Sequence, residues 1–346
     1  MSERELSPAL RWPGATFFVL GVVACSSGGS DAGKVDTAGP PAASAVAVTI
    51  VNTGTRGMAA KTRWLMSRDK TSFIAVVDPV GVEAEPVPNA FFFGSESKNF
   101  QIRVDSAWDV AVSPEWDRIV YSRAFVIRGT ESDTAAAPGA WNEAAQRTGI
   151  DTATLRTSSF ASSGMSYARS VAVPAVIRVG GSESSTTGIP GKLYPIARGW
   201  RVRWTSDGRA IGLGNNPARA QDDEFSQSWA ALDPTTGTIS TSIPGDTKLE
   251  QPKWTEGPTL DVSIPVDMTK APQLFAKVGE TNYTIESQRG VITLRASDTA
   301  TPAVVVGPGI ALAATAGGRF ILALAPRARV GEGESAVELV VYSVSR

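Results

Sequence analysis

The stretch WDVAVSPEWDRIVYSRAFV, residues 108–126, constrains the fold of this chain more than any other. Its first half alternates apolar and polar residues, which is typical of a β-strand with one buried face. A polar turn that contains proline follows at residues 113–117, and a second alternating segment comes after it. Such a hairpin cannot bury its apolar face alone, so it requires further copies stacked against it.

Polar turns that begin with Ser or Thr recur along the chain, each after a short apolar segment. The residues that begin them are Ser67, Ser113, Ser162, Thr205, Thr255 and Thr315. Their successive spacings are 46, 49, 43, 50 and 60 residues, close to the length of one β-propeller blade, about 40 to 50 residues. The segments AVVDP at 75–79 and AALDP at 230–234 are a second repeated feature. The repeats predict an all-β chain built from four-stranded blades.

Two of these turns resemble the W-S-P-D-G-x-x-I-A-Y/F repeat of TolB-type propellers. Residues 204–211 read WTSDGRAI and residues 112–122 read VSPEWDRIVYS. Three other copies match in part, and the copy at Ser162 matches poorly. The resemblance extends over residues 46–346 and implies a six-bladed β-propeller that interacts with proteins of the cell envelope. The alternative is a β-sandwich or a two-domain all-β protein whose hairpins are periodic by chance.

The two ends of the domain raise the question of how a ring of blades would close. Three apolar segments end the chain, at 310–314, 320–324 and 337–344, and no fourth follows them. The missing outer strand could be supplied by residues 47–51, which would leave no exposed sheet edge. Alternatively, residues 46–52 form the innermost strand of the first blade. The sequence leaves both possibilities open.

Composition excludes several classes of function. The chain of 346 residues has no histidine, and its one cysteine is Cys25. Ser-His-Asp and Cys-His catalytic groups, ordinary zinc sites and internal disulfides are therefore impossible. The net charge of -1, with no basic block, argues against nucleic acid as a partner. We expect no cofactor and no bound metal.

The N-terminal region has the pattern of an export signal. Arg4 and Arg11 precede the apolar run of residues 15–23, which is too short to span a bilayer as a helix. Residues 1–24 are therefore predicted to be a signal peptide. A plain secretory signal that happens to end in cysteine is the alternative to the lipoprotein signal considered next.

The segment Val22–Cys25 resembles the lipobox of bacterial lipoproteins. The resemblance implies cleavage before Cys25 and diacylglyceryl modification of its sulfur, which would remove an otherwise unpaired thiol. Ser26 at the next position implies sorting to the outer membrane, facing the periplasm. Residues 25–45 are rich in Ser, Gly, Ala and Pro and are predicted to be a flexible tether. The propeller domain then covers residues 46–346.

Candidate partner contacts come from residues that the repeat does not explain. Trp116 lies in a predicted turn, and Trp141 lies in an insertion at 129–163 with a short helix predicted at 140–147. An acidic run also falls in a long loop, and it consists of Asp222, Asp223 and Glu224. Four other tryptophans precede the repeated turns, so we expect them to pack between blades: Trp64, Trp108, Trp204 and Trp254.

These features favour a monomeric, envelope-anchored lipoprotein whose propeller is a non-catalytic scaffold for a protein partner. The alternative is a carbohydrate-active enzyme, a glycosidase or lyase, with paired carboxylates about 5 to 9.5 Å apart. The acids near predicted turns that could serve it are Asp109, Glu115, Asp117, Asp207 and Glu256. A third possibility is a domain that only positions the lipid anchor.

Overall fold

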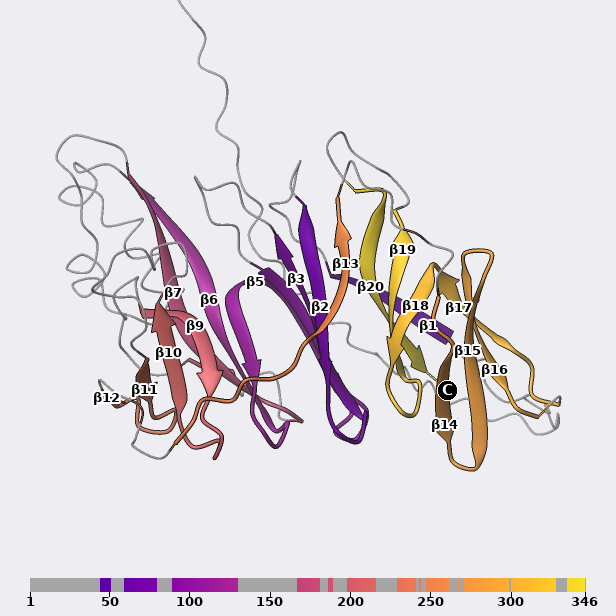
Figure 1. The fold of residues 1–346 in the computed structure, drawn as a ribbon, viewed down its shortest axis with the longest axis horizontal. Coiled ribbons are helices and arrows are strands. Elements are labelled where there is room, and N and C mark those ends of the chain that lie inside the picture. Colours follow the sequence, from indigo (N-terminus) through magenta and orange to yellow (C-terminus); the bar gives the residue numbers. More distant parts are fainter. Residues whose placement is uncertain are drawn as a thin grey trace, which may run out of the picture. The chain divides into compact units, whose positions relative to one another are not determined.

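A computed structural model describes most of the chain after the predicted tether. The described residues are 44–50, 59–79, 89–129, 167–180, 186–188, 198–215, 229–240, 243, 247–261, 267, 271–298, 300–327 and 335–345. Their regular elements are β-strands arranged in four antiparallel sheets, shown in Figure 1. The predicted signal peptide, the lipobox and the predicted helix at 140–147 lie outside the described residues, as does most of the insertion.

Two of the sheets are four-stranded meanders in chain order. The first has the order β12-β11-β10-β9 and consists of β9 (Arg198–Trp204), β10 (Ile211–Asn215), β11 (Ala230–Leu232) and β12 (Ile239–Ser240). The second has the order β14-β15-β16-β17 and consists of β14 (Leu274–Val278), β15 (Thr281–Gln288), β16 (Val291–Ala296) and β17 (Val304–Pro308). Each sheet thus has the connectivity of one propeller blade.

An eight-stranded sheet, of order β13-β2-β3-β4-β5-β6-β7-β8, combines two such units. Its strands are β2 (Ala60–Met66), β3 (Ser72–Pro79), β4 (Asn89–Ser95), β5 (Phe100–Val112), β6 (Arg118–Gly129), β7 (Tyr167–Arg178), β8 (Thr186–Gly188) and β13 (Thr255–Leu260). The first half of β5 pairs with β4, and its second half pairs with β6 after a register shift between Ala107 and Val110. β5 is therefore the outer strand of one unit and the inner strand of the next.

The fourth sheet joins the two ends of the described chain. It has the order β1-β20-β19-β18 and consists of β1 (Ser44–Ile50), β18 (Ile310–Ala314), β19 (Phe320–Pro326) and β20 (Val337–Ser345). β1 pairs antiparallel with β20, from Ser44 opposite Ser345 to Ile50 opposite Leu339. This confirms that the N-terminal strand completes the C-terminal sheet. The alternative, in which it is the innermost strand of the first blade, is wrong because β1 pairs with β20 and belongs to a different sheet from β2 and β3.

Apolar residues on both faces of the strands hold neighbouring sheets together. On β3, Phe73 and Val77 belong to a core cluster shared with Phe320 of the terminal sheet. The alternate residues Ile74 and Val76 belong to a second cluster, shared with β5, β6 and β7. Full burial of a side chain such as Phe or Ile contributes about 1.5 to 3 kcal/mol. Strands buried on both faces explain the continuous apolar runs in the sequence.

The fold class is all-β, of the β-propeller type, as the repeats predicted. Four-stranded antiparallel meanders follow one another along the chain and pack face to face, and a strand from the N-terminus completes the last sheet. A two-layer sandwich would bury one face of each sheet, whereas β3 and β19 bury both of theirs. The sandwich alternative is therefore not supported.

Four of the six predicted turns share one backbone conformation. In each, the amide of the first residue donates to the carbonyl five residues later, at 2.9 to 3.0 Å. The residue three positions after the first has a positive φ, between 58° and 68°. The first residues of these turns are Ser67, Ser113, Thr205 and Thr315, and the residues with positive φ are Lys70, Trp116, Gly208 and Gly318.

The turn predicted at Thr255 is wrong. Thr255 begins strand β13 and lies opposite Trp64 of β2. Three residues after Thr255 comes Pro258, and proline cannot adopt the positive φ that this turn requires at that position. β13 pairs instead along the edge of β2, where the Thr62 hydroxyl donates to the Pro258 carbonyl at 2.7 Å. The turn predicted at Ser162 lies outside the described residues.

The tryptophans that precede the repeated turns are packing residues, as expected. Trp204 is fully buried, and its indole Nε1 donates to the carbonyl of Ala111 on the neighbouring unit at 3.3 Å. Trp108 is also buried. Trp64 and Trp254 are partly buried against the first and second clusters, respectively.

Candidate functional site

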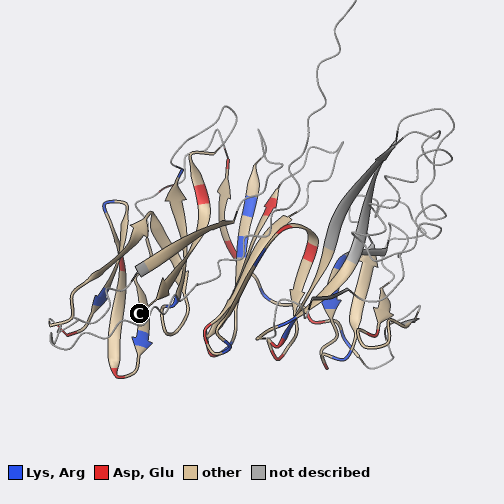
Figure 2. Cartoon of the chain, turned by 180° about the vertical axis from the view of Figure 1, so that it is seen from behind, with Lys and Arg blue, Asp and Glu red and all other residues tan. Residues whose placement is uncertain are grey.

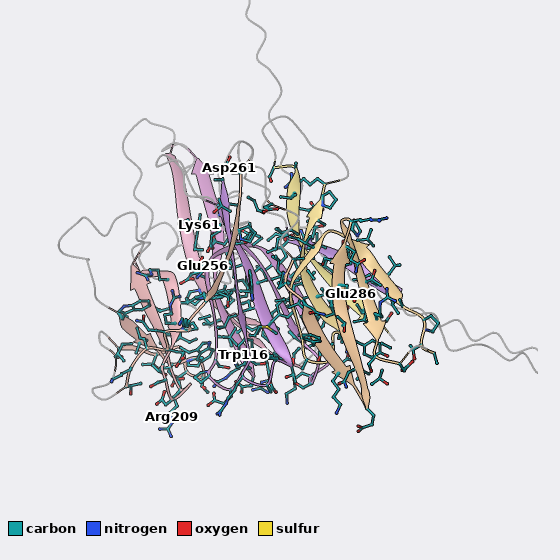
Figure 3. All side chains as sticks on the ribbon, turned by 45° about the vertical axis from the view of Figure 1, so that its right-hand side comes forward. Lys61, Trp116, Arg209, Glu256, Asp261 and Glu286 are labelled. Atoms are coloured by element: carbon teal, nitrogen blue, oxygen red, sulfur yellow. The ribbon has the colours of Figure 1, made fainter. Side chains whose placement is uncertain are left out.

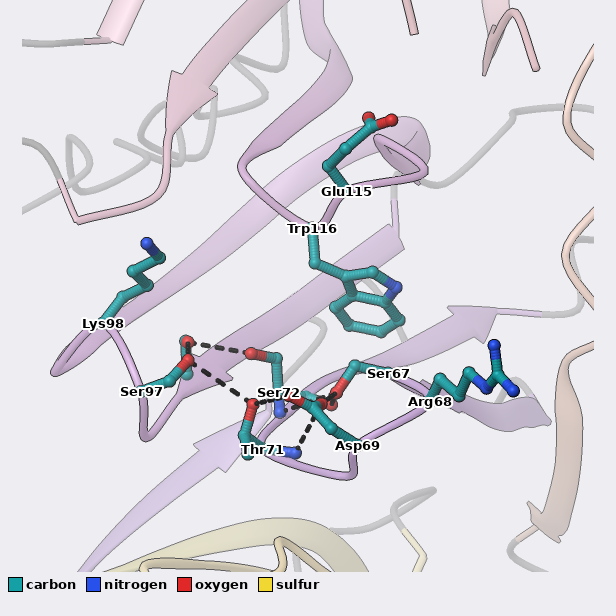
Figure 4. Close-up of a pocket in the computed structure, with 10 residues that line it drawn as sticks. Ser67, Arg68, Asp69, Thr71, Ser72, Ser97, Lys98, Glu115 and Trp116 are labelled. Carbon is teal, nitrogen blue, oxygen red and sulfur yellow. Dashed lines mark hydrogen bonds between the residues drawn. The ribbon is translucent and has the colours of Figure 1, made fainter. Parts of the chain in front are cut away.

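A pocket of about 680 Å³ lies between three turns of the eight-stranded sheet, as Figure 4 shows. One wall is the β2–β3 turn that begins at Ser67, a second is the β4–β5 turn, and the third is the β5–β6 turn. The lining residues are Ser67, Arg68, Asp69, Thr71, Ser72, Ser95, Ser97, Lys98, Glu115 and Trp116. Half of them carry hydroxyl groups, and Trp116 contributes the aromatic surface.

A network of hydroxyl groups fixes the floor of the pocket. The buried Ser72 hydroxyl donates to Ser95 Oγ at 2.8 Å, and Ser95 Oγ lies 3.3 Å from Ser97 Oγ. The carboxylate of Asp69 accepts the Ser67 hydroxyl at 2.6 Å and both the amide and hydroxyl of Thr71 at 3.1 and 2.9 Å. These hydrogen bonds, first of all the one from Ser67, lower the pKa of Asp69. Asp69 is therefore an ionised structural part of the turn.

Trp116 is held in a conformation that bulky residues rarely adopt. Its φ is 59°, in the left-handed region, where a non-glycine residue costs about 1 to 3 kcal/mol. The half-buried indole packs on Phe93, with ring centroids 6.1 Å apart. Trp116, which the sequence indicated as a partner contact, thus forms one wall of the pocket with a fixed orientation.

Charged groups of both signs surround the pocket opening. Arg68, Lys98 and Glu115 are all exposed, and none of the three makes an ion pair with another described residue. Figure 2 shows basic and acidic residues intermixed over the described strands and turns. The Arg118 guanidinium donates to the Gly208 carbonyl at 2.8 Å and lies 4.6 Å from the Trp204 ring centroid, which links this turn to the one at Thr205.

A second polar cluster connects the inner strands of different units. Arg203 and the Val202 amide donate to Asp109 Oδ2 at 2.5 and 3.1 Å. Arg63 donates to Asp78 at 2.5 Å. Burial raises the pKa of Asp78, while Arg63 acts in the opposite direction. Both carboxylates thus have guanidinium partners, the usual arrangement for charges that are removed from water.

Arg63 also connects this cluster to the segment before β13. Its guanidinium carbon lies 4.4 Å from the centroid of the Trp254 ring. At this distance the contact is a cation–π interaction, which stabilises a partly buried cation. The cluster therefore helps to hold β13 against β2.

The acids proposed for catalysis are divided among several places. Asp109 lies in the second polar cluster, Glu115 at the pocket, and Asp117 and Asp207 within turns. Burial of Asp117 is outweighed by hydrogen bonding to Ser113 and by Arg118, so its pKa is lowered. Glu256 is exposed on β13 and lies away from Trp116 in Figure 3. Of the five, Glu115 is the one that lines the pocket.

Several predicted site residues lie outside the described part of the chain: Cys25, Trp141, Asp222, Asp223 and Glu224. Sequence reasoning missed the pocket residues Arg68, Lys98 and Ser97, because nothing local indicates that the β2–β3 and β4–β5 turns meet. In the described ranges no group of three or more His, Cys, Asp or Glu could hold a metal ion. The same ranges contain no helix long and apolar enough to cross a membrane.

Comparisons with known proteins place the chain in no family. No family model matches it, and no curated protein matches it. Structural matches include the β-propeller domain of the Trilobed protease from Pyrococcus furiosus, at 11% identity, 82% coverage of this chain, 69% of that chain and a TM-score of 0.25. Pyrococcus horikoshii acylaminoacyl peptidase matches at 10% identity and a TM-score of 0.28, with 84% of this chain and 39% of that chain covered.

A family 117 glycoside hydrolase from the marine bacterium Zobellia galactanivorans is also similar, at 10% identity, with 88% of this chain and 90% of that chain covered and a TM-score of 0.23. This chain spans only 39% of the length of the acylaminoacyl peptidase. TM-scores this low carry no argument about function. The functional assignment therefore depends on the chain's own residues.

Proposed function

We propose that the chain is an envelope-anchored lipoprotein whose β-propeller is a non-catalytic scaffold for a protein partner. The observation that carries this proposal is the indole of Trp116, which forms a wall of the turn pocket from a backbone conformation that is costly for tryptophan. Backbone strain of this kind is concentrated at functional sites. Tryptophan is also among the residues that dominate the binding energy of protein interfaces.

The construction of the pocket supports binding with a small entropic cost. Its turns are fixed by internal hydrogen bonds such as those of Ser67, Asp69 and Ser72. Groups that are already ordered lose little conformational freedom when a partner binds. The charged residues around the indole match the polar rim that surrounds a typical interface hot spot.

The N-terminal sequence supports the anchor. The lipobox-like segment Val22–Cys25 is followed by a Ser-, Gly- and Pro-rich stretch that leads into β1 at Ser44. A lipid on Cys25 would hold the domain at a membrane while the tether leaves it free to meet partners. We place the protein at the outer membrane, facing the periplasm, and expect a monomer.

A crosslinked pull-down from cell envelopes tests this proposal. Trp116→Ala should lose the captured partner, because truncation of a hot-spot tryptophan typically costs 2 kcal/mol or more, about 30-fold in affinity. Phe275→Ala is the matched control, since Phe275 is an aromatic residue of β14 that is 68% exposed. Capture of the same partner by wild type and Trp116→Ala would contradict the proposal. Cys25→Ser should release the protein from the membrane fraction without changing the partner.

A second candidate is an enzyme with paired carboxylates. One observation favours it: Asp78 has a raised pKa, and its buried Oδ1 has no hydrogen-bond partner among the described residues. If this cluster is catalytic, the purified protein should cleave a glycan from a panel of bacterial envelope polysaccharides. Asp78→Asn and Asp109→Asn should then each remove that activity. Turnover that neither substitution changes would exclude this cluster as the catalytic site.

A further inference from the structure

We propose that the pocket beside Trp116 binds an acidic, extended peptide segment, with an apolar side chain against the indole and carboxylates directed to Lys98 and Arg68. The inference rests on the proposed function and specifies the chemistry of the partner. Three features carry it: two exposed cations without an ion pair among the described residues, the position of the indole, and an exposed hydroxyl group between them.

Of the two acids of the pocket, Asp69 is hydrogen-bonded within its own turn, and Glu115 points away from the Trp116 indole in Figure 4. The Asp69 carboxylate accepts three hydrogen bonds from Ser67 and Thr71. Glu115 Oε2 lies toward the neighbouring turn, 3.0 Å from the position that a Cβ on Gly208 would occupy, and Arg118 Nη2 lies 3.5 Å from the same point. The Glu115 carboxylate is thus directed to the Gly208 turn, where Arg118 forms its own ion pair with Asp117 at 3.4 Å.

Arg68 and Lys98 are exposed, and neither forms an ion pair with another described residue. Figure 4 shows them on opposite sides of the pocket, with Trp116 between them. A segment that crosses the pocket would pass both cations and the indole. Complementary charge at both ends would favour carboxylates and disfavour basic partners.

The hydroxyl groups suit a peptide backbone between these points. The hydroxyl groups of Ser72, Ser95 and Ser97 form a connected series, and the Thr71 oxygen lies 3.4 Å from Ser97 Oγ. Ser72 and Ser95 are buried and support the series from below. An exposed hydroxyl group both donates and accepts hydrogen bonds, so it can serve an N–H or a C=O of an extended chain. Because Ser97 is exposed, its hydroxyl can reach a ligand.

Fluorescence anisotropy with three labelled nonapeptides tests this inference on the full-length chain carrying Cys25→Ser. All three have a central leucine, and the flanking residues are glutamate, lysine or serine. We expect the glutamate peptide to bind at least about tenfold more tightly than the lysine peptide, and salt to weaken it. Arg68→Ala with Lys98→Ala should reduce its affinity about tenfold, and Trp116→Ala should reduce it similarly.

Matched controls separate this inference from the proposed function. Lys277→Ala with Arg289→Ala removes the same charge from exposed positions at β14 and the β15–β16 turn and should leave binding unchanged. Equal, Trp116-dependent binding of all three peptides would overturn the acidic specificity but leave the scaffold proposal intact. No binding of the glutamate peptide would also overturn it. The scaffold proposal is tested separately: it would be contradicted if Trp116→Ala captured the same partner as the wild type.

Discussion

The turns at Thr205 and Thr315 have the same backbone but obtain their carboxylate from different parts of the chain. In the first turn, Asp207 lies two residues after Thr205 and accepts the Thr205 hydroxyl at 2.6 Å and the Arg209 amide at 3.1 Å. The carboxylate and its donors are thus within five residues of one another. The same arrangement occurs at Ser67, where Asp69 accepts the equivalent groups.

In the second turn the position equivalent to Asp207 is Gly317, which has no side chain to offer. Glu96, from the turn between β4 and β5, occupies the vacant place and accepts the Thr315 hydroxyl. It also accepts the amides of Gly317 at 2.9 Å and Arg319 at 2.7 Å. The carboxylate that Asp207 supplies locally is here supplied from a position 219 residues away.

The difference shows how one hydrogen-bonding requirement can serve two structural purposes. A local carboxylate stabilises its own hairpin, whereas Glu96 joins the eight-stranded sheet to the sheet that β1 completes. The Ala316 amide adds a second link between the same sheets by donating to the Lys70 carbonyl at 2.8 Å. Because Ser95 and Ser97 flank Glu96 and line the pocket, the link also supports the candidate binding site.

Replacing Glu96 should have the largest effect on stability. Glu96→Ala removes an acceptor shared by three donors of the Thr315 turn, and hydrogen bonds to a charged group contribute about 2 kcal/mol. Because Glu96 is only partly buried, water replaces part of these three bonds in the variant. We therefore expect the free energy of unfolding, measured by chemical denaturation, to fall by about 2 kcal/mol in total. Affinity for the glutamate peptide should also fall, because the β4–β5 turn loses its support.

A local carboxylate at residue 317 is the control for this prediction. In the Glu96→Ala background, Gly317→Asp places a carboxylate where Asp207 stands in the other turn and should restore about half of the lost stability. In the wild type the same change should destabilise, since a Cβ at residue 317 would lie 2.8 Å from Glu96 Oε2. Failure of the second substitution to recover any stability would refute the equivalence of the two carboxylates.

Replacing Asp207 should have a smaller effect that depends on pH. Asp207→Ala should lower the free energy of unfolding by about 1 kcal/mol at pH 7, because two hydrogen bonds are lost in an exposed turn. The hydrogen bond from Thr205, first of all, lowers the pKa of Asp207. Its contribution is therefore complete above the unfolded-state pKa of about 4 and is lost as the pH falls through the folded-state pKa.

Urea denaturation at several pH values checks this expectation. The difference between wild type and Asp207→Ala should shrink below about pH 4. Asp207→Asn serves as the control, since it keeps the acceptor but removes the charge. A difference that stays constant to the lowest pH would mean that the carboxylate charge is irrelevant to the turn.

The sequence was informative wherever the determining interactions are local. A Ser or Thr at the start of a polar turn predicted the turns at Ser67, Ser113, Thr205 and Thr315. The tryptophans that precede three of these turns pack as expected. The prediction at Thr255 failed on a local feature too. Pro258 stands where positive φ is required, so the failure was readable from the sequence once the turn geometry was known.

The long-range features could not be predicted. Nothing near Thr315 indicates that Glu96 completes its turn, because the two residues meet only when the sheets pack. Trp116 was identified as a possible contact only because it is an aromatic residue in a turn. Arg68 and Lys98 were not identified, because they approach Trp116 only when the three turns meet in the fold. For β1 the sequence offered two positions, and the pairing with β20 decides for the closing strand. That possibility was visible because three apolar segments, and no fourth, end the chain.

The smallest predicted effect concerns the positive-φ position that the four turns share. Gly208 and Gly318 adopt it without steric cost, whereas Lys70 adopts it at a φ of 58° with an exposed side chain. A left-handed backbone costs a non-glycine residue about 1 to 2 kcal/mol. Replacement by glycine removes this cost, but about half of the gain is lost because glycine has more conformational freedom in the unfolded state. Lys70→Gly should therefore stabilise the protein by about 0.5 to 1 kcal/mol, as measured by chemical denaturation.

Trp116 provides the contrast that sharpens this prediction. Its backbone is equally strained, but its indole packs on Phe93 and belongs to the edge of the second core cluster. Trp116→Gly relieves the strain and removes that packing, which for a large aromatic side chain outweighs about 1 kcal/mol of strain. We expect Trp116→Gly to destabilise while Lys70→Gly stabilises. If both substitutions stabilised the fold, packing could not explain the tryptophan at this position, and binding would be the remaining physical reason for it.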